Sequence, residues 1–133
     1  MKFYDVSMTI YNGMPVYKNK PEKQPSIDTV TNGYVTESRL HIDAHTGTHV
    51  DAPLHMVVDG ETIETIPLEK LVGSCKVFDL TEVEDRITKA DIEQLAIEKD
   101  DFVLFKTKNS FDEEFNFDFI FVAEDAAHYL VEK

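Results

Sequence analysis

The most constraining feature of this sequence is a cluster of histidines in residues 41–55, HIDAHTGTHVDAPLH. Four of the five histidines in the 133-residue chain lie in this window, together with two aspartates. The six residues are His41, Asp43, His45, His49, Asp51 and His55. Imidazole nitrogens and carboxylate oxygens are common ligands of zinc and related divalent ions. The window therefore predicts a metal site.

The composition of the window argues against a helix, although His45 and His49 are four residues apart. Gly47 and Pro53 both disfavour helical structure. We expect instead a strand that ends in a turn at Gly47 and continues as an extended piece. Residues two apart in an extended chain point the same way, so His49 and Asp51 would share a face. The turn would bring His45 back to them, and three protein ligands with an open position are typical of a catalytic zinc site.

The remaining histidines of the window admit more than one interpretation. A single histidine is more often a surface or core residue than a ligand, and His41 fits that description. Ala52 precedes a proline and is therefore biased towards extended geometry. The extended geometry would place His55 a short distance beyond the expected site.

Eight residues of the window have the identity and spacing of a known signature. They are His45, Gly47, Thr48, His49, Asp51, Ala52, Pro53 and His55. This pattern resembles that of the metal-dependent cyclase family, which includes bacterial kynurenine formamidases (arylformamidases), isatin hydrolases and some polyketide cyclases. Weaker similarity runs through stretches such as YDVSMTIYNGMPVY, PLEKLVGSCKVFDL and AAHYLVEK. The resemblance implies that His45, His49 and Asp51 bind a divalent metal, Zn²⁺ first and Mn²⁺ second, and that His55 is the catalytic proton carrier.

The fold class follows from the order of the expected elements. Strand patterns interleaved with short helical patterns predict an α/β or α+β chain, and the resemblance favours α/β, as the swivelling β/α/β domain of the cyclase family over residues 1–133. Family members are longer by a strand and a C-terminal segment, which supplies a further His and a Glu to the metal site. No residue here matches those two, so the resemblance implies a domain that lacks the C-terminal part.

Individual elements are predicted from local patterns. Alternating apolar residues or apolar runs predict strands, and Asn32-Gly33 predicts a hairpin turn. Thr88 and Asp91 approximate a capping box that opens a helix. The expected strands cover residues 3–10, 26–30, 34–43, 75–80 and 102–107, the last with both faces buried. Three helices are expected. The first is short and begins at Pro67, the second covers residues 89–97 and the third covers residues 123–131.

Charge and composition narrow the partners and the compartment. The net charge of −13 argues against nucleic acid and anionic membrane surfaces as partners. The chain has no apolar run of about 20 residues that could cross a bilayer and no secretory signal pattern, so we expect a cytoplasmic protein. Cys75, the single cysteine, excludes an internal disulfide and is expected to be buried.

The chemistry expected of the site is metal-assisted amide hydrolysis. A bound divalent ion acidifies water and polarises a carbonyl, and a histidine such as His55 can move the proton. The resemblance implies a small aromatic amide as substrate, N-formylkynurenine or a related aryl formamide or cyclic amide, and a homo-oligomer, either dimer or tetramer. The alternative is a shortened family member that binds metal and oligomerises with little or no catalysis.

Four further residues outside the window could contact a substrate. Tyr17 and Met14 could face it, or could simply anchor their loop. Lys106 and Lys108 could hold a substrate carboxylate, or could be solvated.

Overall fold

The computed structural model describes residue 2 and residues 4–133, which form two compact units. Unit 1 consists of the described residues up to Ile63 together with Glu113–Phe115. Unit 2 consists of Glu64–Asp112 and Asn116–Lys133. The division into two compact units does not test whether residues 1–133 form a single domain, which stays a prediction.

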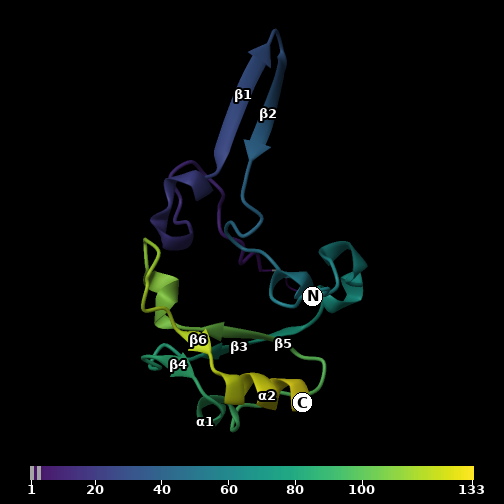
Figure 1. Cartoon of the computed structure of the whole chain (residues 1–133), viewed down its shortest axis with the longest axis vertical. Coiled ribbons are helices and arrows are strands. Elements are labelled where there is room, and N and C mark those ends of the chain that lie inside the picture. Colours follow the sequence, from purple (N-terminus) through teal and green to yellow (C-terminus); the bar gives the residue numbers. More distant parts are fainter. Residues whose placement is uncertain (1, 3) are drawn as a thin grey trace. The chain divides into compact units, whose positions relative to one another are not determined.

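Unit 1 contains the predicted hairpin. Strands β1 (Ser26–Asn32) and β2 (Val35–His41) pair antiparallel with Asn32 opposite Val35 (Figure 1). Gly33 opens the two-residue loop with φ of +64°, a conformation that glycine adopts without steric cost. The turn dipeptide therefore fixed the register of the hairpin as expected.

The rest of unit 1 is held by turns and by side-chain hydrogen bonds. It has 3₁₀ turns at Tyr17–Asn19, Pro21–Lys23 and Pro53–His55. The strand predicted over residues 3–10 is wrong for its described part, residues 4–10, and Phe3 lies outside the described residues. Side chains satisfy two of its backbone donors: the Met8 N–H donates to the Thr48 hydroxyl over 2.8 Å, and the Ser7 N–H donates to the Asp5 carboxylate over 2.9 Å.

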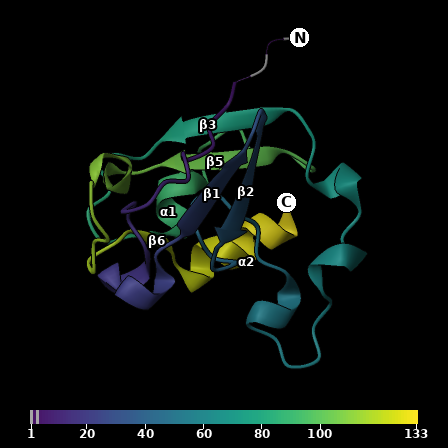
Figure 2. The same cartoon turned by 90° about the horizontal axis from the view of Figure 1, so that it is seen from above.

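Unit 2 contains the remaining strands and both α-helices. Strands β3 (Cys75–Asp79) and β5 (Phe102–Lys106) pair in parallel, as do the short strands β4 (Arg86–Ile87) and β6 (Phe121–Val122). Helices α1 (Lys89–Ile92) and α2 (Glu124–Glu132) lie on the same side of the β3–β5 pair (Figure 1), and Figure 2 shows β3 alongside β5 from above. Further 3₁₀ turns lie at Ile63–Thr65, Leu68–Lys70 and Lys108–Phe111.

Helix α1 begins as the sequence predicts but ends earlier. The Asp91 carboxylate accepts the Thr88 backbone N–H over 2.7 Å and the Thr88 hydroxyl over 2.6 Å, which confirms the capping interaction. The helix ends at Ile92, whereas the prediction extended to residue 97. Beyond Ile92 the chain tightens into turns, with the Ile97 N–H donating to the Leu95 carbonyl over 2.7 Å. The helix predicted from Pro67 is likewise only a 3₁₀ turn.

The hydrophobic core of unit 2 lies between its helices and strands. Its buried members come from helices, strands and the segments that follow them, and several half-buried side chains, including Phe78, Val103 and Phe105, pack against them. The buried members are Leu80, Ile87, Ile92, Ile97 and Ala126. Strand β5 pairs with β3 alone among the described strands, and Phe102 is 36% exposed, so the prediction that both faces of β5 are buried is wrong.

The mixed α/β character agrees with the predicted fold class. Helix α2 covers the predicted C-terminal helix and buries Ala126. Cys75 is exposed, because it lies at the first position of β3, so its predicted burial is wrong. Within the described part of the chain, no helix is long and apolar enough to cross a membrane.

Candidate metal centre

The histidine window leaves β2 through a turn built by Asp43. The carboxylate of Asp43 accepts the His45 backbone N–H over 3.1 Å, and its main-chain carbonyl accepts the Thr46 N–H, also over 3.1 Å. An aspartate that bonds the backbone two residues further on forms an Asx turn. This turn reverses the chain directly after the strand and directs His45 back over the following segment.

Gly47 continues the turn in a conformation that other residues rarely adopt. Its φ is +62°, and a Cβ atom there would lie 2.7 Å from Cδ1 of Ile10. The Gly47 carbonyl accepts a hydrogen bond from Nδ1 of His49 over 2.8 Å. The glycine thus permits both the close approach of residues 8–10 and the orientation of the His49 ring. The turn at Gly47 was predicted from the sequence.

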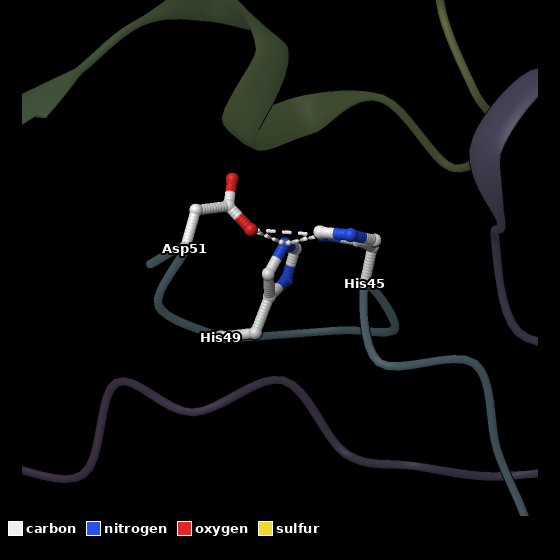
Figure 3. A group of neighbouring side chains, drawn as sticks. All are labelled: His45, His49 and Asp51. Carbon is white, nitrogen blue, oxygen red and sulfur yellow. Dashed lines mark hydrogen bonds and ion pairs between the residues drawn. The ribbon is translucent and has the colours of Figure 1, made fainter. Parts of the chain in front are cut away.

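Three side chains of the window converge on one point (Figure 3). Nδ1 of His45 lies 2.8 Å from Oδ1 of Asp51, and Nε2 of His49 lies 3.5 Å from the same oxygen. The two imidazole nitrogens are 3.3 Å apart. In the described part of the chain, these residues form the one group of three or more potential ligands whose donor atoms lie within 4.8 Å of one another.

The donor atoms fit a divalent ion in their spacing and chemistry. Ligands about 2.1 Å from a tetrahedral zinc lie about 3.4 Å from one another. The separations of 3.3 and 3.5 Å found here are close to that value, and the separation of 2.8 Å between His45 and Asp51 is shorter. A carbonyl can only accept, so Nδ1 of His49 carries the proton that it donates to Gly47. In the neutral ring, Nε2 then carries the lone pair, which faces His45 and Asp51. The tautomer required of a metal ligand is thereby set by the backbone.

His55 lies beside this group but outside it. It ends the 3₁₀ turn Pro53–His55, and its ring centroid is 4.1 Å from that of His45. His41 instead faces Asp28 across the hairpin, with Nε2 of His41 and Oδ2 of Asp28 3.4 Å apart. His41 therefore lies apart from the four residues predicted to form the site, which are His45, His49, Asp51 and His55.

The group opens into a cavity of about 570 Å³ within unit 1. His45, His49 and Asp51 are all partly exposed to solvent there. The lining residues are Met8, Pro15, Val16, Tyr17, Lys23, His45, Gly47, His49, Asp51, His55 and Phe115. Tyr17 therefore faces the space next to the site, as one interpretation of the sequence held, whereas Met14 is fully buried and serves to anchor its loop.

Sequence reasoning missed the contribution of Lys23 to the cavity. The Nζ atom of Lys23 lies 2.7 Å from Oδ2 of Asp43. The Lys23 ammonium, followed by the His45 N–H, holds the pKa of the Asp43 carboxyl below its usual range. Phe115 packs edge-on against Tyr17 with ring centroids 5.2 Å apart. Twenty residues or more separate these partners, and no local pattern links them.

The other polar candidates lie in unit 2. Asp79 accepts both the backbone N–H and the hydroxyl of Thr81, over 3.0 and 2.7 Å, and so caps the turn that follows β3. Lys106 lies 3.6 Å from the same carboxylate. His128 is exposed on α2, and its Nε2 lies 3.6 Å from Oε1 of Glu124.

Comparisons with known proteins place this geometry in a family context. The family model for the Cyclase family matches residues 4–133. A kynurenine formamidase from Erythrobacter litoralis is 30% identical over 132 residues, covering 97% of this chain and 60% of that protein. A kynurenine formamidase from Salinibacter ruber is also 30% identical, covering 99% of this chain and 65% of that protein. The chain therefore spans less than two thirds of the length of these relatives.

Two solved structures are similar in fold and in sequence. One, described as a potential metal-dependent hydrolase with cyclase activity, superposes with a TM-score of 0.88 at 67% identity and covers 98% of this chain and 62% of that one. The other, described as a "predicted metal-dependent hydrolase" from Bacillus stearothermophilus, superposes with a TM-score of 0.84 at 71% identity. It covers 98% of this chain and 63% of that one.

Proposed function

Because the chain belongs to the Cyclase family, we propose that it takes part in metal-dependent hydrolysis of C–N bonds, acting on a small aromatic amide. The leading substrate is N-formylkynurenine or a related aryl formamide or cyclic amide, which agrees with the kynurenine formamidases among its relatives. The observation that carries the proposal is the convergence of His45, His49 and Asp51 on one point of an open cavity.

The three converging residues are proposed as the metal ligands, with Zn²⁺ as the first expectation and Mn²⁺ as the second. Two imidazoles and a carboxylate suit several divalent ions, and three protein ligands leave a position open for chemistry. When bound, such an ion would acidify water and polarise the amide carbonyl. The Asx turn of Asp43 and the bond from His49 to Gly47 orient the two imidazoles.

His55 is proposed as the proton carrier. Its ring lies against that of His45 and on the cavity wall, so it reaches the same space as a substrate held at the ligands. An imidazole can accept a proton from the attacking water and return it to the leaving amine. The aromatic rings of Tyr17 and Phe115 offer a surface for the ring of the substrate.

The proposal is tested by metal content and hydrolysis in a matched pair of variants. After loading with Zn²⁺ or Mn²⁺ and dialysis, we expect the wild type to retain metal and to hydrolyse N-formylkynurenine. His49→Ala is expected to lose metal affinity by more than the roughly 10–100-fold typical of outer-shell changes. The control His128→Ala removes an exposed histidine of α2 and is expected to change neither quantity.

Two results would count against parts of the proposal. Equal metal content in His49→Ala and the wild type would remove the ligand assignment. Stoichiometric metal without hydrolysis of any aryl formamide would favour the alternative, in which this chain binds metal with little or no catalysis.

We also propose a homo-oligomer, either dimer or tetramer. Among the described strands, β1 and β2 pair only with each other, and the hairpin exposes apolar side chains on both of its faces. Val30 is 66% and Val35 47% exposed on one face, Leu40 is 57% exposed on the other, and Tyr34 in the turn is fully exposed. A two-stranded hairpin is only marginally stable in water by itself, so a second copy would stabilise it by packing against one of these faces. Light scattering after size exclusion should give a mass of at least two chains, and a monomer at micromolar concentration would contradict the proposal.

A further inference from the structure

A single loop of unit 1, residues 13–24, supplies both an aromatic and a cationic side chain to the cavity. The side chain of Gln24 closes this loop, because its amide donates to the Met14 carbonyl over 2.9 Å and its carbonyl accepts the Gly13 N–H over 3.1 Å. Met14 is fully buried at the base of the loop. Tyr17 and Lys23 therefore reach the cavity from a loop whose two ends are fixed to each other.

Lys23 brings a positive charge to a wall otherwise made of apolar groups, histidines and one carboxylate. Among the described lining residues it is the one lysine or arginine. Its Nζ lies 2.7 Å from Oδ2 of Asp43, and its side chain remains 30% exposed. An ammonium has three N–H donors, so the pairing with Asp43 leaves two that can bind another acceptor.

Asp43 holds the Lys23 ammonium at a fixed position next to the candidate ligand His45. The second oxygen of Asp43 accepts the His45 backbone N–H over 3.1 Å. Asp43 thus contacts Lys23 with one oxygen and the ligand-bearing turn with the other. The Lys23 charge is held at a defined place beside His45, as a positioned binding group requires.

The aromatic part of the cavity comes from the same loop. The Tyr17 ring packs at 80° against the ring of Phe115, and the side-chain carbonyl of Asn19 accepts the Phe115 N–H over 3.2 Å. Lys18 and Asn19 have φ values of 55° and 51°, a left-handed conformation that is costly for residues other than glycine and often marks functional sites. The strained turn keeps Tyr17 beside Phe115 on the cavity wall.

We propose that Lys23 binds an anionic substituent of the substrate, so that the cavity selects aromatic amides that carry a carboxylate. The proposal rests on the proposed function and refines its substrate class. With a divalent ion at His45, His49 and Asp51, the ion and Lys23 together would outweigh the charges of the two carboxylates. The cavity would then favour anions within a chain whose net charge is −13.

The test measures binding and needs no turnover, so it can fail independently of the hydrolase assignment. The probes are 2-aminobenzoate and its methyl ester, which share a ring and differ in the negative charge. Their dissociation constants are measured by fluorescence with the Zn²⁺-loaded protein. We expect the wild type to prefer the carboxylate about tenfold, the effect of one charge-assisted hydrogen bond.

Two substitutions separate a binding role of Lys23 from a purely structural one. The amide of Lys23→Gln can still donate to Asp43 but has no charge, whereas Lys23→Met removes both functions. Both variants are expected to lose the preference for the carboxylate. Lys23→Gln is also expected to retain its metal content.

The matched control is Lys20→Gln. Lys20 lies in the same loop and carries the same charge, but it is exposed, with Nζ 3.8 Å from Oε1 of Glu22, and lies outside the cavity wall. We expect this variant to keep the wild-type preference. The proposal is overturned if the preference for the carboxylate persists in Lys23→Gln or if the wild type shows no preference. It is also overturned if Lys23→Gln loses affinity equally for both probes.

Discussion

The two units of this chain are stabilised by different interactions. Of the hydrophobic residues that are buried in the described part of the chain, five belong to unit 2 and only Met14 and Val16 to unit 1. Unit 1 is held instead by side chains that bond the backbone, such as Asp43 to His45, Gln24 to Met14 and Thr48 to Met8. The candidate site lies entirely in the unit with little apolar core.

This difference follows from what each unit has to do. A metal centre needs several polar side chains aimed at one open point, and such groups cannot be buried without partners. Unit 1 therefore positions its candidate ligands through turns and directional hydrogen bonds, whereas unit 2 derives its stability from burial. Substitutions at the site should change chemistry more than folding, and substitutions in the core should do the reverse.

The largest effect is expected from His55→Ala. The variant should lose about 10²–10⁴-fold in turnover, the usual contribution of a general acid–base. It should retain its metal because His55 lies outside the group formed by His45, His49 and Asp51. Turnover of N-formylkynurenine, metal content and thermal unfolding are measured on one preparation, and unchanged turnover would remove the proposed role of His55.

The opposite behaviour is expected of Ile92→Ala in the core of unit 2. Ile92 is fully buried, and truncating such a side chain lowers the free energy of unfolding by about 2–5 kcal/mol through lost burial and the cavity left behind. Metal affinity should be unchanged at temperatures where the variant is folded. Denaturant unfolding and a metal titration check the two halves of the prediction.

The control for Ile92→Ala is Val131→Ala on α2. Val131 is 87% exposed, so its truncation should change the free energy of unfolding by no more than about 0.5 kcal/mol. If Ile92→Ala lost metal affinity while still folded, the contrast between the two units would be wrong.

The same contrast explains which features could be predicted from sequence. The hairpin, β3, β5 and α2 follow from periodicity and turn residues, which act over a few positions. The convergence of His45, His49 and Asp51 was also predictable, because they lie within seven residues and a single turn at Gly47 joins them.

Features that depend on distant partners could not be predicted. Asp43 and Lys23 are 20 residues apart, and Phe115 follows Asn19 by 96 residues. Local patterns cannot indicate such contacts. Residues 4–10 alternate as a strand would, yet they bond to side chains because no strand pairs with them among the described residues. Alternation of apolar residues indicates which face of a strand can be buried. It does not indicate whether another strand is present to pair with it.

The smallest expected effect concerns the first turn of α1. Thr88→Ala removes the hydroxyl that donates to Asp91 over 2.6 Å, and loss of an N-cap side chain typically costs about 1 kcal/mol. Thr88→Ser keeps the hydroxyl and should retain the wild-type stability. Denaturant unfolding of both variants at neutral pH measures the difference in the free energy of unfolding. Neither substitution should change the proposed metal binding or hydrolysis in unit 1.

The pH dependence of that difference tests its cause. The Thr88 hydroxyl, followed by the Thr88 backbone N–H, lowers the pKa of Asp91 from the ordinary value of 3.8. A carboxyl whose pKa is lower in the folded state contributes stability above its unfolded pKa and loses it as pH falls through the folded value. The gap between wild type and Thr88→Ala should therefore be complete at neutral pH and shrink in acid below that ordinary value. A gap of constant size down to pH of about 3 would show that the hydroxyl acts independently of the Asp91 charge.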